Sequence, residues 1–178
     1  MEIIVVSDTN IFIDLIEIEL LDEFFSLPWE IHTTDMVVYE LKDAIQRNNV
    51  LKYISEGSLL MDACDEKAML ALMKFYALHR ETTNVSIQDC SVWFYAKNNG
   101  CILLTGDSKL RSAALKTGVD VHGILFIIDN LIDKHLLAKE TAVNKLNKLK
   151  LLNPRLPLSE IDKRIKIWRE DEKEGDRK

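Results

Sequence analysis

The ten residues from Ile3 to Phe12 read IIVVSDTNIF, and this stretch decides which kind of fold the chain can form. Four consecutive β-branched residues predict a strand buried on both faces, which is typical of a parallel sheet covered by helices. The apolar run stops at Ser7-Asp8-Thr9-Asn10 and then resumes, so we expect a helix to begin close to Asp8. The sequence therefore places a carboxylate at the carboxyl end of a buried strand.

Short apolar runs and segments of helical periodicity alternate along the chain. The predicted strands are residues 2–7, 29–33, 58–61, 101–105 and 118–122. The predicted helical segments are residues 11–27, with a break near residues 17–20, and residues 34–45, 50–56, 65–80, 86–98 and 108–116. This alternation predicts a three-layer α/β/α domain with a central parallel sheet. We expect the domain to span residues 1–128.

The remaining part, residues 129–178, is predicted to be a helical extension packed on that domain. Residues 124–168 have the pattern of three helices, interrupted near residues 133–138 and at Asn153-Pro154. The last residues, 170–178, are almost all charged, and we expect them to be frayed.

The composition is that of an ordinary soluble protein. The 178 residues are 47% hydrophobic and 29% charged, which fits one globular domain with a small addition. No apolar run reaches the roughly 20 residues that span a bilayer, and the N-terminal strand pattern has no basic flank, so we expect no membrane segment and no signal peptide. Cys64, Cys90 and Cys101 lie in apolar contexts without zinc-ligand spacing, which indicates reduced core residues in a cytoplasmic protein.

The net charge of −6 is divided unevenly between the two parts of the chain. Residues 1–107 contain 7 basic and 18 acidic side chains, a balance of −11, and residues 108–178 contain 16 and 11, a balance of +5. Lys and Glu side chains on the solvent-exposed faces of long helices would explain this distribution of charge. The alternative is that the acidic part holds a cation and the basic part meets a polyanion.

Two of the predicted central strands deliver an aspartate to their carboxyl ends, Asp8 after IIVVS and Asp107 after ILLTG. Open parallel sheets bind ligands at that edge. Two like charges about 5 Å apart there would repel by several kcal/mol, so a divalent cation between them is a simple expectation. The alternative is that each aspartate only caps the helix that follows it.

Two further acidic residues have equally ordinary explanations when each is taken alone. Asp89 completes a capping box with Ser86, and Glu40 shares the polar side of its helix with Asp43 and Arg47. It is the order of the four acids along the predicted elements that is specific.

This ordered set resembles the PIN domain, a family of metal-dependent nucleases. The segments that carry the resemblance are Ser7–Asn10, Val38–Leu41, Gln88–Ser91 and Leu104–Ser108, within residues 1–128, and the later helices resemble an extension of some prokaryotic PIN-like proteins. The third segment departs from the family pattern, because it reads D-C-S where many relatives have D-A. The resemblance implies that the metal-binding and catalytic residues are Asp8, Glu40, Asp89 and Asp107. It also implies that Asn10 and Thr105 orient these carboxylates without binding the metal themselves.

Carboxylate clusters suit Mg²⁺ or Mn²⁺, which are hard cations with oxygen ligands and can serve phosphodiester hydrolysis. The histidines, at positions 32, 79, 122 and 135, share no motif and are expected to be structural or exposed. Lys109 and Arg111 follow the fourth acid closely and are candidates for contact with phosphates. More remote candidates in the C-terminal helices are Lys145, Lys148 and Lys150.

The leading hypothesis is therefore an endoribonuclease that depends on Mg²⁺ or Mn²⁺. The resemblance further implies a toxin that acts on RNA, forms a homodimer and is silenced by a small antitoxin protein. The alternative is a catalytically idle PIN-like module that binds RNA or a protein. A nucleotide-binding or phosphoryl-transfer protein is disfavoured, since the chain has neither a Gly-rich phosphate loop nor a D-x-D pattern at Asp8.

Overall fold

The computed structural model describes residues 3–175, and it describes the side chains of residues 3–170. The centre of this part of the chain is a five-stranded sheet in which all neighbouring strands are parallel. The strand order is β3-β2-β1-β4-β5, with β1 Ile3–Ser7, β2 Trp29–Thr34, β3 Leu60–Asp62, β4 Ile102–Leu104 and β5 Val121–His122.

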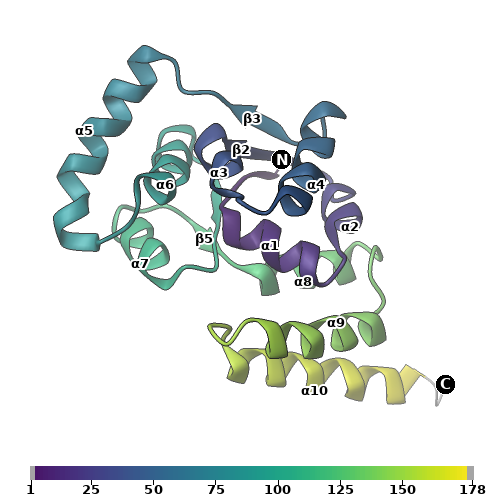
Figure 1. Cartoon of the computed structure of the whole chain (residues 1–178). Coiled ribbons are helices and arrows are strands. Elements are labelled where there is room, and N and C mark those ends of the chain that lie inside the picture. The colour runs from purple at the N-terminus through teal and green to yellow at the C-terminus, as the bar shows by residue number, and fades with distance from the viewer. Residues whose placement is uncertain (1–2, 176–178) are drawn as a thin grey trace.

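Helices cover both faces of the sheet, so the three-layer α/β/α fold predicted from the sequence is confirmed (Figure 1). One layer contains α5 Glu66–Thr83, α6 Ile87–Asn99 and α7 Ser108–Lys116. The other layer is grouped around α1 Thr9–Glu17 and includes α2 Leu21–Phe25, α4 Ala44–Ser55 and α8 Ile124–Asp133. The short helix α3 Asp35–Glu40 contacts α1 and α6, which belong to different layers.

Strand β1 lies in the middle of the sheet because its side chains are apolar on both faces. Val5 pairs with Ile31 of β2 on one side and with Ile102 of β4 on the other, and both Val5 and Val6 are fully buried. The strand order reverses at β1, since β2 lies on one side of it and β4 on the other. The carboxyl end of β1 is therefore the switch point at which open parallel sheets bind their ligands.

The prediction of one helix over residues 34–45 and another over residues 50–56 is wrong. Helix α3 ends at Glu40, and α4 begins already at Ala44. The reason is Asp43, whose Oδ1 accepts hydrogen bonds from the backbone N–H groups of Ile45 and Gln46 at 2.8 and 2.9 Å and so caps a new helix. Glu40 consequently stands at the C-terminal end of a short helix.

The C-terminal part consists of α8, α9 Lys139–Leu152 and α10 Leu158–Gly175, the three helices predicted from the sequence. Helices α9 and α10 lie side by side at one end of the molecule (Figure 1). Helix α10 continues to Gly175 and residues 176–178 lie outside the described part, so the fraying expected for residues 170–178 stays a prediction. Ile161, Ile165 and Trp168 are buried, and this apolar stripe gives α10 a face to pack.

Cys90 and Cys101 are buried and Cys64 is half-buried, and all three are free thiols. No helix among residues 3–175 is long and apolar enough to cross a membrane.

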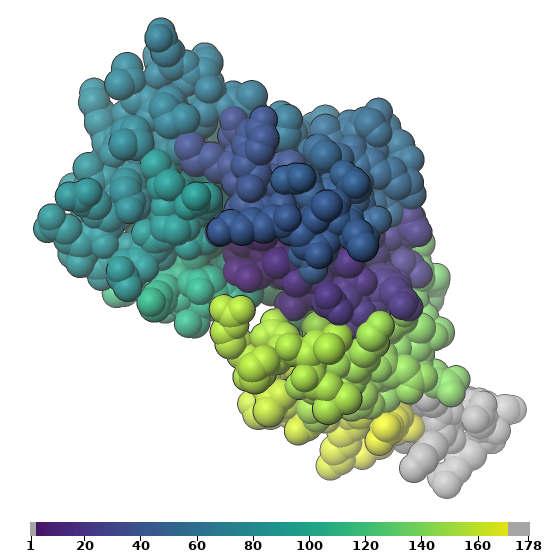
Figure 2. Space-filling view, in the orientation of Figure 1, coloured from purple at the N-terminus to yellow at the C-terminus, as the bar shows by residue number. Residues whose placement is uncertain are grey.

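Figure 2 shows the purple N-terminal residues lying between the blue segment and the yellow-green C-terminal helices. The N-terminal helix is thus flanked by parts of the chain that are far away in sequence.

Candidate active site

Asp8 lies at the carboxyl end of β1, and its carboxylate is held by Asn10 in the first turn of α1 and by Thr105, which directly follows β4. The residue is 1% exposed. Its Oδ1 accepts a hydrogen bond from the backbone N–H of Asn10 at 3.1 Å, which caps α1, and its Oδ2 accepts one from the Thr105 hydroxyl at 2.5 Å. The Asn10 side chain also donates to Oδ2, at 3.4 Å. Asn10 and Thr105, the two residues expected to orient carboxylates, therefore both contact Asp8.

The Thr105 hydroxyl also links Asp8 to the fourth acid, Asp107. It accepts a hydrogen bond from the Asp107 backbone N–H at 3.0 Å while it donates to Asp8. The carboxylate of Asp107 caps α7, because its Oδ1 accepts from the backbone N–H groups of Lys109 and Leu110, both at 2.8 Å. Parallel pairing of β1 with β4, which sets Ser7 opposite Leu104, brings these two aspartates to one edge.

Glu40 reaches the same edge from the end of α3. Its Oε2 accepts a hydrogen bond at 2.6 Å from the hydroxyl of Thr9, the residue directly after Asp8. Helix α3 is itself anchored by Thr34, whose hydroxyl caps it and hydrogen-bonds to the Ser91 hydroxyl of α6 at 2.7 Å. The early end of α3 at Glu40 thus places this glutamate beside the start of α1.

Asp89 approaches from the first turn of α6, where the predicted capping box is present. The Ser86 hydroxyl accepts from the Asp89 N–H, and Asp89 Oδ2 accepts from the Ser86 N–H at 3.2 Å. Asp89 is close enough to Asp8 that its negative charge helps to raise the pKa of the Asp8 carboxyl. Capping and proximity to Asp8 are therefore compatible in this residue.

The pKa of Asp8 is raised to about 6, mainly because burial penalises the charged carboxylate. The hydrogen bonds from Thr105 and Asn10 act in the opposite direction, and the charge of Asp89 adds to the rise. No lysine, arginine or histidine among the described side chains pairs with Asp8. The buried carboxylate of Asp8 therefore lies near a second negative charge with no cationic side chain to neutralise either of them, which is electrostatically unfavourable.

The four acids face one edge of the sheet, yet they do not converge on a single point. Among the side chains of residues 3–170, no three Asp, Glu, His or Cys groups lie close enough together to hold one metal ion. Glu40, Asp89 and Asp107 each use one carboxylate oxygen in a hydrogen bond, and the other oxygen makes none with the described residues. Such oxygens are the ligands that Mg²⁺ and Mn²⁺ prefer, so the chemistry of this donor set fits these ions.

The basic residues predicted to contact phosphates differ in the hydrogen bonds and ion pairs that they already make. Arg111 donates to the backbone carbonyls of Val121 at 2.9 Å and Thr105 at 3.2 Å, and burial lowers the pKa of its guanidinium. Lys145 and Lys148 both pair with Glu19, and Lys150 pairs with Asp162. Lys109 is exposed and makes no ion pair within the described part of the chain. Lys109 is therefore the candidate best placed to meet a phosphate.

Two contacts at this edge were missed by sequence reasoning. Thr9 stands inside the SDTN motif, but nothing in the sequence shows that it donates to a glutamate 31 residues away. Arg111 supports the carbonyl of Thr105, and Gly123 gives it room: a Cβ on Gly123 would lie 3.0 Å from an Arg111 nitrogen. Gly123, directly after the predicted strand 118–122, is a signal in the sequence for this close approach.

Comparison with known proteins agrees with this architecture. A family model described as PIN domain matches residues 4–170, which is most of the chain. The chain therefore belongs to the PIN domain family. The match includes most of the segment predicted as a C-terminal extension, and no curated protein matches the chain in sequence.

Two solved structures share the fold at low sequence identity. The protein PAE2754 from Pyrobaculum aerophilum has a TM-score of 0.52 and 12% identity, covering 75% of this chain and 99% of its own. A PilT N-terminus domain protein, SSO1118, from the archaeon Sulfolobus solfataricus P2 has a TM-score of 0.52 and 15% identity, covering 72% of this chain and 93% of its own. Both are nearly fully covered, whereas about a quarter of this chain has no counterpart in them.

Proposed function

We propose that this protein is an endoribonuclease that depends on Mg²⁺ or Mn²⁺, with Asp8, Glu40, Asp89 and Asp107 as its metal-binding and catalytic residues. The observation that carries the proposal is the environment of Asp8. This carboxylate is buried at the switch point of the sheet, lacks a cationic partner among the described residues, and lies within electrostatic reach of Asp89. Membership of the PIN domain family, whose members are nucleases in general, supports the same assignment.

Each of the chain's own residues has a distinct part in the proposed site. Asp8 is the shared ligand, held in one rotamer by Thr105 and Asn10, and with a pKa of about 6 it is mostly ionised at pH 7. Glu40, Asp89 and Asp107 would each contribute the carboxylate oxygen that is not used in a hydrogen bond. When bound, the metal ions would supply an activated water and stabilise charge on the leaving oxygen. Lys109 would hold a substrate phosphate outside the acidic centre.

Calorimetric titration with Mn²⁺ tests the proposal, with Asp8→Asn and Asp107→Asn beside the parent. We expect the parent to bind and both variants to bind at least tenfold more weakly, since each loses a charged ligand. Asp14→Asn is the matched control, because Asp14 is also buried with a pKa raised to about 6 but is not one of the four acids. Cleavage of RNA by the parent, stopped by EDTA and absent from Asp8→Asn, would complete the test.

One observation favours the alternative of a catalytically idle module that binds RNA or a protein. The carboxylates do not converge on one point among the described side chains. A parent that binds RNA but neither takes up Mn²⁺ nor cleaves would establish that alternative. The roles as a toxin with an antitoxin partner and as a homodimer stay predictions drawn from the family resemblance.

A further inference from the structure

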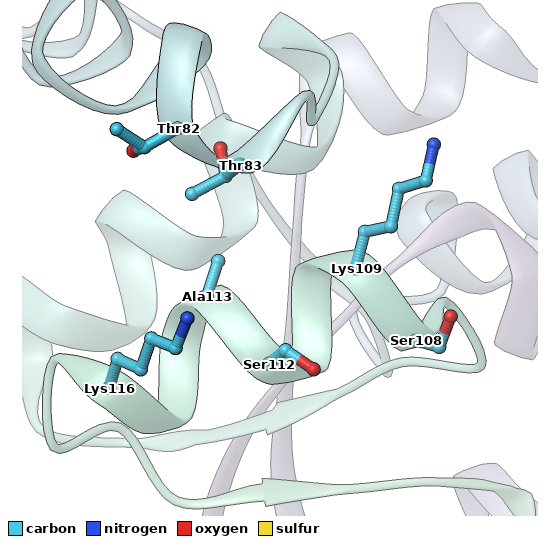
Figure 3. Close-up of a pocket in the computed structure, with 7 residues that line it drawn as sticks. All are labelled: Thr82, Thr83, Ser108, Lys109, Ser112, Ala113 and Lys116. Carbon is cyan, nitrogen blue, oxygen red and sulfur yellow. The ribbon is translucent and has the colours of Figure 1, made fainter.

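A polar groove lies directly beside the proposed site, between the last turn of α5 and the length of α7. It has a volume of about 290 Å³ and is lined by Thr82, Thr83, Ser108, Lys109, Ser112, Ala113 and Lys116. Figure 3 shows both threonines on one side and the α7 residues on the other, with both lysines extending from the side of α7 that faces α5. Lys116 and the two threonines belong to none of the four motif segments in the sequence.

The α7 side of the groove is a stripe on one face of a helix. Ser112 and Ala113 lie three and four residues after Lys109, and Lys116 lies four and three residues after them, so the four residues share a face. The two lysines are two turns apart, about 10 Å along the axis. The stripe begins next to the fourth acid, since the Lys109 backbone N–H donates to Asp107. A strand held at Asp107 can thus continue along α7.

The hydrogen-bonding groups on the two sides of the groove differ in kind. Within the described part of the chain, the side chains of Ser108, Lys109, Ser112 and Lys116 make no hydrogen bond or ion pair, so the α7 side offers free donors. The hydroxyls of Thr82 and Thr83 already donate to the His79 carbonyl at 3.1 and 2.9 Å. Their oxygens are therefore left as acceptors. The α7 side suits an anion, and the α5 side suits a neutral donor.

The charge of the groove also distinguishes it from other hollows of the molecule. No Asp or Glu of the described side chains lines it, although the chain is acidic overall. The larger hollow between α1 and the turn after α9 is lined by Asp14, Glu17 and Arg155, and the hollow beside α2 contains Glu19 and Asp22. Carboxylates in those places would repel a phosphate backbone.

We propose that this groove binds the RNA strand next to the scissile bond, with backbone phosphates on Lys109, Ser112 and Lys116 of α7 and ribose 2′-hydroxyls on Thr82 and Thr83 of α5. The inference rests on the proposed function for the strand's position, since it extends the path from Asp107. Phosphates need donors and positive charge, and the 2′-hydroxyl is a donor that distinguishes RNA from DNA.

The test measures binding of a labelled single-stranded RNA, and of the DNA of the same sequence, to full-length protein that carries Asp8→Asn to prevent cleavage. In this background we expect Lys116→Ala to weaken binding of both strands roughly three- to tenfold and to reduce the slope of log K against log salt by about 0.7, the value for one phosphate on a single strand. Lys116→Arg keeps the charge and should retain most of the affinity. Lys134→Ala, an exposed lysine on the opposite layer, is the control and should change neither quantity.

The paired variant Thr82→Val and Thr83→Val tests the ribose side. It keeps the shape of both side chains and removes the acceptors, so RNA binding should weaken about threefold while DNA binding stays unchanged. An equal RNA-to-DNA preference in parent and variant would overturn the ribose contact.

The outcomes separate this inference from the proposed function. If the parent protein cleaves RNA but Lys116→Ala leaves the RNA affinity and the salt slope unchanged, only the proposal that the groove binds RNA is refuted. Binding of RNA that depends on Lys116, in a parent that does not cleave, supports the groove and refutes the nuclease. If the protein binds neither single-stranded RNA nor single-stranded DNA at low salt, both the groove proposal and the nuclease proposal are refuted.

Discussion

Asp8 caps a helix, but its negative charge is buried without a cationic partner among the described residues. As a helix cap it needs only one oxygen, which accepts from the Asn10 N–H. Its second oxygen is engaged by Thr105 and Asn10, and the whole carboxylate is removed from water. Burial beyond the needs of a cap raises its pKa, so the ionised residue costs the folded state free energy at neutral pH.

The first prediction follows from that cost. The rise of the Asp8 pKa from 3.8 to about 6 corresponds to about 3 kcal/mol. We expect Asp8→Asn to raise the free energy of unfolding at pH 7, without divalent ions, because it removes the buried charge. The gain should be only about 1–2 kcal/mol, because an amide accepts fewer of the existing hydrogen bonds than a carboxylate does. Urea unfolding of both proteins in EDTA measures this difference.

The dependence of stability on pH has a defined sign. Between pH 3.8 and about 6 the folded protein holds a proton on Asp8 that the unfolded chain has lost, so stability falls as pH rises through this window. Asp14, with its pKa also raised to about 6, contributes in the same sense. Asp8→Asn should therefore lose less stability between pH 4 and pH 7 than the parent. A variant that is the less stable protein at pH 7 would contradict this account.

At the scale of the elements, Thr105 joins the ends of two strands and a helix. Its hydroxyl donates to the acid after β1 and accepts from the residue that caps α7, and its carbonyl accepts from Arg111. The residue is fully buried. The relative placement of Asp8 and Asp107 thus depends on one hydroxyl between them.

We expect Thr105→Val to lower the free energy of unfolding by about 1–3 kcal/mol, because it keeps the shape but leaves the Asp107 N–H without its acceptor. The same variant should weaken Mn²⁺ binding measured by calorimetry, since Asp8 loses its strongest orienting contact. Thr105→Ser retains the hydroxyl and is the control for both quantities. Equal Mn²⁺ affinity in the valine and serine variants would show that the hydroxyl does not position the acids.

At the scale of the whole molecule, the C-terminal helices are fastened to α1 by a polar contact. The Asn153 amide, in the turn between α9 and α10, donates to both oxygens of Asp14 at 3.0 and 3.3 Å. Burial raises the pKa of Asp14 to about 6, and Asn153 and the charge of Arg155 counteract this rise. The extension therefore stabilises a buried charge in the helix that begins at the candidate active site.

Asn153→Ala should lower the free energy of unfolding by about 1–3 kcal/mol at pH 7, since the buried, ionised Asp14 then loses a hydrogen-bond donor. At pH 4 the folded protein holds Asp14 protonated, and the loss should be smaller. Asn130→Ala is the matched control, because the Asn130 amide donates to a neutral carbonyl, that of Phe126, at 2.8 Å. Unfolding measured at both pH values would refute the account if the two variants showed the same dependence on pH.

Most of the helices and strands, and all four candidate acids, could be predicted from the sequence. Buried strands such as IIVVS are continuous apolar runs, and caps such as Ser86 with Asp89 are local hydrogen bonds, so both are visible in short windows. The boundary at Asp43 was missed because apolar residues continue at helical spacing through it, and only the formed cap separates α3 from α4.

How those residues contact one another could not be predicted from the sequence. The contact of Thr9 with Glu40, the bridge of Thr105 between two aspartates and the anchoring of Arg111 on Val121 and Thr105 join residues that no local pattern relates. The groove between Thr82 and Lys116 likewise exists because α5 and α7 pack in the same layer. Local propensity acts over a few residues, whereas these contacts depend on strand order and helix packing, which form only when the whole core is buried.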